Sequence, residues 1–246
     1  MGSAGEPIEL LKAAPWLAEG LNGDGPDVAA LVVPSLSFEP GPWAWESPAP
    51  AVGLLILTGR MARVLHVDEA PARGLELVGD GDLLRPWSFR GSTLSIPSRV
   101  EWMALSDLRV VELDLAFVRA STRWPRLWIN LLDSTVERTR SFSYFLTARQ
   151  VARLELRILL TLWHLADRWG RISRDGVVLD LPKLTHEMIG AMVSARRPSV
   201  TTGIRTLREL GVLEVRSRGR WVLIGDPIES LHRVRDSLPE PSGAGR

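Results

Sequence analysis

Two adjacent arginines, Arg196 and Arg197, stand where an amphipathic pattern begins in "SARRPSVTTGIRTLRELG", residues 194–211. The N-terminus of a helix favours negative charge, so two cations placed there imply that an anion is supplied from outside the helix. A guanidinium group binds phosphate, and also the O6 and N7 atoms of guanine, through paired hydrogen bonds. The stretch therefore raises the question of whether that anion is DNA.

The charge of the chain is divided unevenly along its length. Residues 1–120 carry nine Lys and Arg against sixteen Asp and Glu, a net charge of −7, whereas residues 171–225 carry ten against five, a net charge of +5. A basic segment attached to an acidic body favours one local surface for a polyanion over general binding of anions. Drift in arginine content is the alternative explanation of this asymmetry.

The segments around the two arginines predict a winged helix-turn-helix. "VVLDLP" is typical of a short strand, and Thr185 is suited to cap a helix over "HEMIGAMVS". After the short turn "ARR", a second helix is predicted over "PSVTTGIRTLREL", with Pro198 at its first position and Gly211 as its C-cap. "VLEVRSRGRWVLIG" then predicts a β-hairpin that turns at residues 217–219.

In this motif the second helix enters the major groove with its N-terminal residues at the base edges. Val200, Ile204 and Leu207 have the spacing of a stripe that docks on the first helix, which leaves the polar positions exposed. We expect Arg197 to read a base, and the arginines of the predicted β-hairpin, which forms the wing of the motif, to contact phosphates. The predicted DNA-binding residues are Thr185, Arg196, Arg197, Ser199, Thr201, Thr202, Arg205, Arg216, Arg218 and Arg220.

Upstream of the motif, the pattern changes from strands to helices. Short apolar runs with Gly, Pro and Asp between them, from "VGLLILTG" to "RVVELD", predict an antiparallel sandwich or barrel over residues 52–118. A long helix is predicted from Pro125 to about residue 147, with Leu127, Leu131, Phe142 and Phe145 on its apolar side, and a second one over 148–169 that ends at Gly170. The spacing fits either the wall of a bundle or a dimer seam.

This order of parts resembles the Crp/Fnr regulators, the cyclic-AMP-receptor-like transcription factors. "LTHEMIGAMVSARRPSVTTGIRTLRELGVLEV" is similar to the family's "LTxxxIAxxxGxxRxTVxRxLxxLxxxGLI" pattern, and the family's base-reading arginine falls on Arg197. The family glutamate that often follows is replaced by Pro198, and a second family arginine by Thr202. "GDGDLL" and "MALSDLRVVELDLAFVRASTRWPRLWINLL" resemble, more weakly, a barrel turn and the passage into the dimerisation helix.

The resemblance implies an α+β fold: an N-terminal β-barrel or jelly roll like that of cyclic-nucleotide-binding domains, a long dimerisation helix and a C-terminal winged helix-turn-helix. The expected parts are 1–118 for the β-rich domain with N-terminal helices, 119–148 for the dimerisation helix, 149–235 for the DNA-binding domain and 236–246 for a tail. The implied partners are double-stranded DNA with an inverted-repeat operator, a second copy of the chain and RNA polymerase.

The effector site of the family is degenerate in this chain. Cyclic-nucleotide binders carry "GEx" followed about ten residues later by "RSA". Here the corresponding upstream segment, "PWSFRGSTLSIPS", has no Gly-Glu pair, and Ser98, Arg99 and Val100 fall where Arg, Ser and Ala are expected. We therefore expect no control by cyclic AMP, leaving constitutive action, control through abundance, or an apolar effector. Candidate effector-binding residues are Trp87, Arg90, Arg99 and Trp102. The tryptophans of the β domain line a ligand pocket or, as an alternative, fill its core.

Several other classes of protein are disfavoured. The chain has no cysteine, so disulfides and iron–sulfur clusters are excluded, and its four histidines are too scattered to indicate a metal site, so no cofactor is expected. No Walker loop, Gly-x-Ser-x-Gly or His-Glu-x-x-His occurs, so we do not expect an enzyme. Without a membrane-length apolar run or a signal segment, we expect a cytoplasmic protein. The alternative function is that of a ligand-binding or scaffold protein that uses its winged helix for protein–protein contacts.

Overall fold

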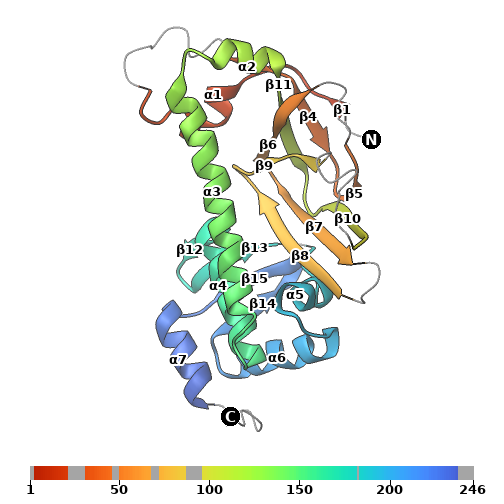
Figure 1. Ribbon diagram of the computed structural model, residues 1–246. Coiled ribbons are helices and arrows are strands. Elements are labelled where there is room, and N and C mark those ends of the chain that lie inside the picture. The colour runs from red at the N-terminus through yellow and green to blue at the C-terminus, as the bar shows by residue number, and fades with distance from the viewer. Residues whose placement is uncertain are drawn as a thin grey trace. The chain divides into compact units, whose positions relative to one another are not determined.

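The computed structural model describes residues 3–21, 31–45, 50–67, 72–86, 96–181 and 183–237 (Figure 1). These residues form two compact units, 1–140 and 141–246, and each is described by itself. No helix in the described ranges is long and apolar enough to cross a membrane.

The first unit is built on antiparallel strands. One sheet has the order β1-β4-β11-β6-β9 and a second has the order β5-β10-β7-β8, while β2 and β3 pair separately. The strands are β1 (Ser3–Ala4), β2 (Ile8–Glu9), β3 (Val32–Val33), β4 (Ser35–Phe38), β5 (Gly41–Trp43), β6 (Ala51–Thr58), β7 (Arg60–Val67), β8 (Ala72–Gly79), β9 (Leu83–Leu84), β10 (Ser98–Ala104) and β11 (Leu108–Asp114). This arrangement confirms the β-rich N-terminal domain of the predicted α+β fold.

The helices of the first unit begin close to prolines or polar caps. α1 (Leu10–Ala13) is followed by the 3₁₀ helix η1 (Pro15–Ala18), which begins at Pro15. α2 (Leu115–Ser121) is capped by Asp114, whose Oδ1 accepts a hydrogen bond from the Phe117 amide at 2.8 Å.

The long helix is α3 (Pro125–Ala148), which begins at Pro125 as the sequence indicated, rather than at residue 119. Residues 119–121 belong instead to α2, which ends before Pro125 because the residue preceding a proline is disfavoured in the helical conformation.

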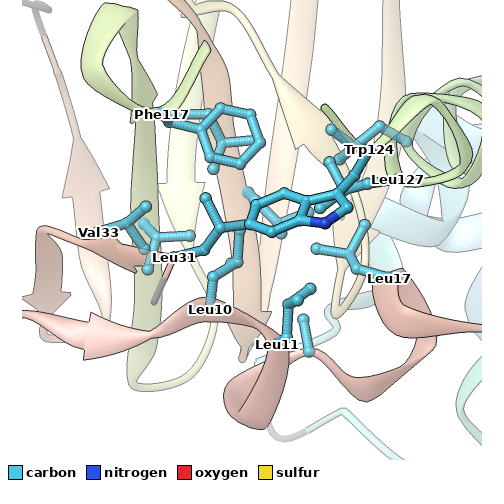
Figure 2. Close-up of a cluster of buried hydrophobic side chains, with 13 residues drawn as sticks. Leu10, Leu11, Leu17, Leu31, Val33, Phe117, Trp124 and Leu127 are labelled. Carbon is cyan, nitrogen blue, oxygen red and sulfur yellow. The ribbon is translucent and has the colours of Figure 1, made fainter. Parts of the chain in front are cut away.

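An apolar cluster covers one side of the five-stranded sheet (Figure 2). It joins α1, η1, α2 and the first turns of α3 to β6 and β11, with the indole of Trp124 among the leucines. Leu127 and Leu131 of α3 are buried in this cluster. Asn130 of the same helix donates to the carbonyl oxygens of Leu17 and Glu19, both at 3.0 Å, so η1 is fixed on α3 by polar contacts as well.

This packing decides which side of α3 is free. The predicted apolar side included Leu127 and Leu131, but both are used inside the chain and do not form a seam. In the part of α3 that belongs to the first unit, the exposed large apolar residues are Ile129 (45% exposed), Leu132 (61%) and Val136 (40%). Their spacing of three and four residues places them in one stripe along α3. Phe142, also on the predicted apolar side, is 45% exposed in the second unit.

The second unit contains the predicted winged helix-turn-helix. Its elements are the end of α3, α4 (Leu154–Trp169), β12 (Arg171–Ser173), β13 (Gly176–Asp180), α5 (His186–Val193), α6 (Arg197–Glu209), β14 (Leu213–Arg216), β15 (Arg220–Leu223) and α7 (Pro227–Ser237). The strand order is β12-β13-β15-β14, and the 3₁₀ turn η4 (Ser217–Gly219) closes the predicted hairpin. α4 ends at Gly170 as predicted, but begins at residue 154, later than expected.

Candidate nucleic-acid interface

The turn between α5 and α6 requires a glycine in the first helix. Ser194 takes the left-handed conformation, with φ 55° and ψ 52°, and the Ala195 amide donates to the Gly190 carbonyl at 2.9 Å. A Cβ atom on Gly190 would lie 2.4 Å from the Ala195 carbonyl oxygen, closer than any real contact. The glycine at position 190 is therefore a consequence of how tightly the chain turns.

Thr185 caps α5, as the sequence predicted. Its Oγ1 accepts a hydrogen bond from the Met188 amide at 3.1 Å, while the residue itself is exposed. Because the hydroxyl acts as an acceptor in this cap, its own proton stays available to donate to a phosphate oxygen.

Two arginines that the sequence analysis did not single out bind the other end of α5. Arg149 donates from Nε to the Met192 carbonyl at 2.5 Å and from Nη2 to the Ala191 carbonyl at 2.9 Å. Arg157 donates from Nη1 to the Val193 carbonyl, also at 2.9 Å. These carbonyls lie in the last turn of the helix, where no intrahelical donor is available. No local pattern could reveal them, because the donors lie 36 to 43 residues before their acceptors.

The apolar stripe of α6 is buried, as predicted. Val200, Ile204 and Leu207 are at most 4% exposed. α6 also packs closely on α4, since a Cβ on Gly203 would lie 2.9 Å from Cδ1 of Ile158. This contact fixes the orientation of the helix and leaves its opposite side free.

The start of α6 differs by one residue from the prediction. Arg196 is the N-cap, with extended backbone at φ −75° and ψ 148°, and Arg197 is the first helical residue. Pro198, expected at the first position, takes the second, where it is equally tolerated because that amide has no helical partner either.

The free side of α6 carries the polar residues predicted to contact DNA. Neither Arg196 nor Arg197 forms an ion pair with any described carboxylate, and Arg205 lies 3.8 Å from Glu209. The exposed residues are Arg196, Arg197, Ser199, Thr201, Thr202 and Arg205. The structure therefore brings all six to one exposed helix surface, with two cations at its N-terminus.

Thr201 is less free than its exposure indicates. Its hydroxyl donates to the Arg197 carbonyl at 3.0 Å, and its Oγ1 lies 2.9 Å from Nδ1 of His186 on α5. His186 is a residue of this surface that the sequence analysis missed. The signal that could have found it is its position directly after the Thr185 cap.

The three wing arginines differ in their contacts. Arg216 bonds to Asp175 and Glu214 from one nitrogen, Nη2, at 2.9 Å each, and these hydrogen bonds, Glu214 first, raise its pKa. Its charge is therefore compensated inside the wing, which sequence reasoning did not foresee. Arg220 is exposed at the start of β15, whereas the side chain of Arg218 lies outside the described residues.

The predicted effector residues are not all brought together. Exposure alternates along β10, so Arg99 lies on the outer face, where it pairs with Glu101 at 2.7 Å. Trp102 lies on the other face, 6.1 Å from the ring of Trp43. Strand alternation thus separates Arg99 from Trp102, which corrects their grouping in one site. Trp87 and Arg90 lie outside the described residues.

The described tryptophans of the β domain pack in its core and also adjoin a hollow. Trp43 is 6% exposed and belongs to the core cluster between the two sheets, with Trp45 and Trp102 packed against it. A hollow of about 600 Å³ nevertheless adjoins them, lined by Trp43, Trp45, Val64, Pro86, Val100, Glu101 and Trp102 among others. The lining is largely apolar, as ligand pockets are.

A charged group inside the first unit was missed by sequence reasoning. Arg138 of α3 donates from Nε and Nη2 to the two carboxylate oxygens of Glu76 on β8, at 2.7 and 3.0 Å, and from Nη1 to the Leu83 carbonyl. Arg63 contacts the same carboxylate at 2.7 Å and lies over the ring of Trp102. Two partly buried arginines thus share one glutamate.

Residues 156–229 match the model of the Crp-like helix-turn-helix domain. No curated protein matches the sequence significantly. Among solved structures, a cyclic nucleotide-binding domain containing protein from Listeria monocytogenes EGD-e is 17% identical, covers 94% of this chain and 100% of its own, and has a TM-score of 0.64. FixK2 from Bradyrhizobium japonicum is 16% identical, with 82% of this chain and 96% of its own chain covered and a TM-score of 0.60.

A third structure, a CRP-family transcriptional regulator from Thermus thermophilus, is 19% identical and covers 81% of this chain and 96% of its own, with a TM-score of 0.58. At these identities the structures establish the fold, and the helix-turn-helix model establishes the kind of C-terminal domain. Residues 156–229 therefore form a Crp-like helix-turn-helix domain, and the chain as a whole has a fold similar to that of these solved structures.

Proposed function

We propose that this protein is a sequence-specific DNA-binding transcriptional regulator that acts as a homodimer and is not controlled by cyclic AMP. The observation that supports DNA binding is the N-terminus of α6, where Arg196 and Arg197 are exposed and have no described carboxylate partner. A helix buried on one side and cationic at its exposed tip has the form of a recognition helix. RNA polymerase is the partner through which such a regulator would act.

The dimer is supported by the stripe on α3. Ile129, Leu132 and Val136 expose apolar side chains on a helix whose other side is already packed on its own β domain. Exposed apolar stripes at helical spacing are typical of helix pairing. A helix-turn-helix also needs a second copy to read two half-sites.

The absence of cyclic-AMP control is supported by the β domain. The segment just before β10 lacks the family's Gly-Glu pair, the Arg-Ser-Ala motif is missing, and Arg99 points to the outer face of β10. Arg138 and Arg63 are already bound to Glu76, so a phosphate would have to displace that carboxylate. Each polar group of the ligand that is left unpaired costs about 1–3 kcal/mol. An unpaired phosphate and an unpaired ribose hydroxyl together cost several kcal/mol, and about 4 kcal/mol turns a micromolar dissociation constant into a millimolar one.

Fluorescence anisotropy with a mixed-sequence duplex tests DNA binding. We expect binding that weakens steeply as salt is raised, and a marked loss for Arg196→Ala/Arg197→Ala. Retention of full affinity by that double variant would contradict the proposal, as would binding without salt dependence. Calorimetry tests control by cyclic nucleotides. We expect no binding of cyclic AMP or cyclic GMP with a micromolar dissociation constant, and such binding would overturn the proposed independence from cyclic AMP.

A further inference from the structure

His186, the first residue of α5, is held by a contact from α6. Its Nδ1 lies 2.9 Å from Oγ1 of Thr201, and its ring lies 6.4 Å from that of Trp221 on β15. The residue is half-buried at the edge of the surface formed by the exposed residues of α6. The ring is therefore fixed in place while one edge stays accessible.

The protons of this contact can be assigned from the neighbouring hydrogen bond. A threonine hydroxyl has a single proton, and that of Thr201 is donated to the Arg197 carbonyl at 3.0 Å, one turn earlier. Oγ1 must then accept from His186, which places a proton on Nδ1. In the neutral ring Nε2 carries the lone pair, and it has no partner among the described residues.

The surroundings keep this ring neutral in the DNA-free protein. Burial, and then the charge of Arg197 on α6, lower the pKa of His186 below its usual range. On β15 the facing group is the uncharged Trp221, and on α5 itself the neighbouring carboxylate is that of Glu187, which is exposed. A neutral Nε2 with a lone pair would repel a phosphate oxygen.

We propose that His186 binds a phosphate of the DNA backbone through Nε2, and that its ring takes up one proton from solvent when it does so. This inference rests on the proposed DNA-binding function. A phosphate is favoured over a base because the first helix of a helix-turn-helix crosses the backbone. The proton converts Nε2 from acceptor to donor, and the phosphate charge favours the imidazolium form.

Thr201 then has a different role from the one the sequence indicated. Its hydroxyl positions His186 and is fully used within the chain, so it is a positioning residue rather than a DNA contact. Arg197 provides the carbonyl that orients the hydroxyl, which links the recognition helix to the phosphate contact through consecutive hydrogen bonds.

The sign of the pH effect follows from the uptake of a proton. The pKa of His186 is low in the free protein and higher in the complex, so affinity is greatest below both values and falls as pH rises between them. One proton changes the dissociation constant by at most about tenfold per pH unit. The relevant range is about pH 5 to 8, where histidines titrate.

The test measures DNA affinity across that pH range for the wild type and for His186→Gln, which keeps a donor but does not titrate. The matched control is His232→Gln, an exposed histidine on α7. We expect wild type and the His232 variant to lose affinity together as pH rises, several-fold or more, and the His186 variant to lose much less. The loss should be equal on a scrambled duplex of the same length, since a phosphate carries no sequence information.

A second measurement does not depend on DNA. Nitrogen-15 NMR of histidine-labelled, DNA-free protein at neutral pH should show the Nδ1–H tautomer for His186, and Thr201→Val should abolish that preference. An Nε2–H tautomer in the wild type contradicts the inference. The inference is also contradicted if the DNA affinities of the wild type and His186→Gln depend on pH in the same way, or if the pH dependence of affinity is confined to one base sequence. If the wild type binds no DNA at any pH, the proposed function itself has failed.

Discussion

Arg138 and Glu76 meet through two parallel hydrogen bonds, 2.7 and 3.0 Å long, that join the long helix to a strand of the β domain. Both side chains are largely buried, at 19% and 11% exposed, and Glu76 also binds Arg63. The charges of these three side chains are thus paired with one another inside the first unit.

Removing the Glu76 carboxylate should therefore lower the stability of the protein. Glu76→Ala leaves two partly buried arginines without their partner, and we expect a loss of about 3–5 kcal/mol in the free energy of unfolding. Thermal or urea unfolding measures this loss. Glu137→Ala is the control, because its pair with Arg140 on the same helix is mostly exposed and should have almost no effect. Equal stability of the two variants would contradict a structural role for Glu76.

Gly190→Ala should damage the helix-turn-helix. The new Cβ would lie 2.4 Å from a backbone oxygen that cannot move without breaking the turn, so we expect a loss of more than about 2 kcal/mol together with loss of DNA affinity. Gly225→Ala is the comparison: its φ is +84° and nothing lies within 4 Å of the Cβ, so strain alone should cost about 1–2 kcal/mol. If chemical denaturation shows that Gly225→Ala loses more stability than Gly190→Ala, the tight turn after α5 is not what requires a glycine at position 190.

Leu132→Glu should convert a dimer into a monomer. Leu132 is 61% exposed in the single chain, so a charge there should leave the monomer folded but disfavour an apolar seam. Ile228→Glu on α7, where the replaced residue is 59% exposed, is the matched control and should stay dimeric. Sedimentation velocity at micromolar concentration distinguishes the two. A wild type that is monomeric both with and without DNA would exclude the proposed assembly.

The arginines should divide into three kinds. Arg197→Ala should relax base choice at one position per half-site, at a cost of about 1–3 kcal/mol per contact. Arg218→Ala and Arg220→Ala should instead weaken all sequences about equally and reduce the salt slope by about one. Arg216→Ala should leave the salt slope unchanged, because Asp175 and Glu214 already compensate its charge. A common, sequence-independent loss in all four variants would refute the assignment of Arg197 to base readout.

The sequence was sufficient wherever the signal was local. The Thr185 cap, the buried stripe of Val200, Ile204 and Leu207, and the hairpin turn at residues 217–219 follow from capping and periodicity within a few residues. The change from short strands to long helices followed in the same way. These elements are determined by short-range rules of helix and turn formation, which the sequence displays directly.

What the sequence did not reveal depends on contacts between distant segments. Leu127 and Leu131 were indistinguishable from seam residues until the N-terminal segment was seen packed on them. The Arg149 and Arg157 caps, the Glu76 ion pairs and the contact of His186 with Thr201 all join residues at least 13 positions apart. Their geometry is set by tertiary packing, for which periodicity carries no information.

Selection of bound duplexes from a random library with the purified protein shows whether this chain reads DNA as a two-fold dimer. We expect enrichment of an inverted repeat whose half-site centres lie about one helical turn, ~34 Å, apart, and loss of one specified base position per half-site with Arg197→Ala. A library that shows no enriched sequence, or one that enriches a single unrepeated site bound equally well by the variant, would contradict this expectation.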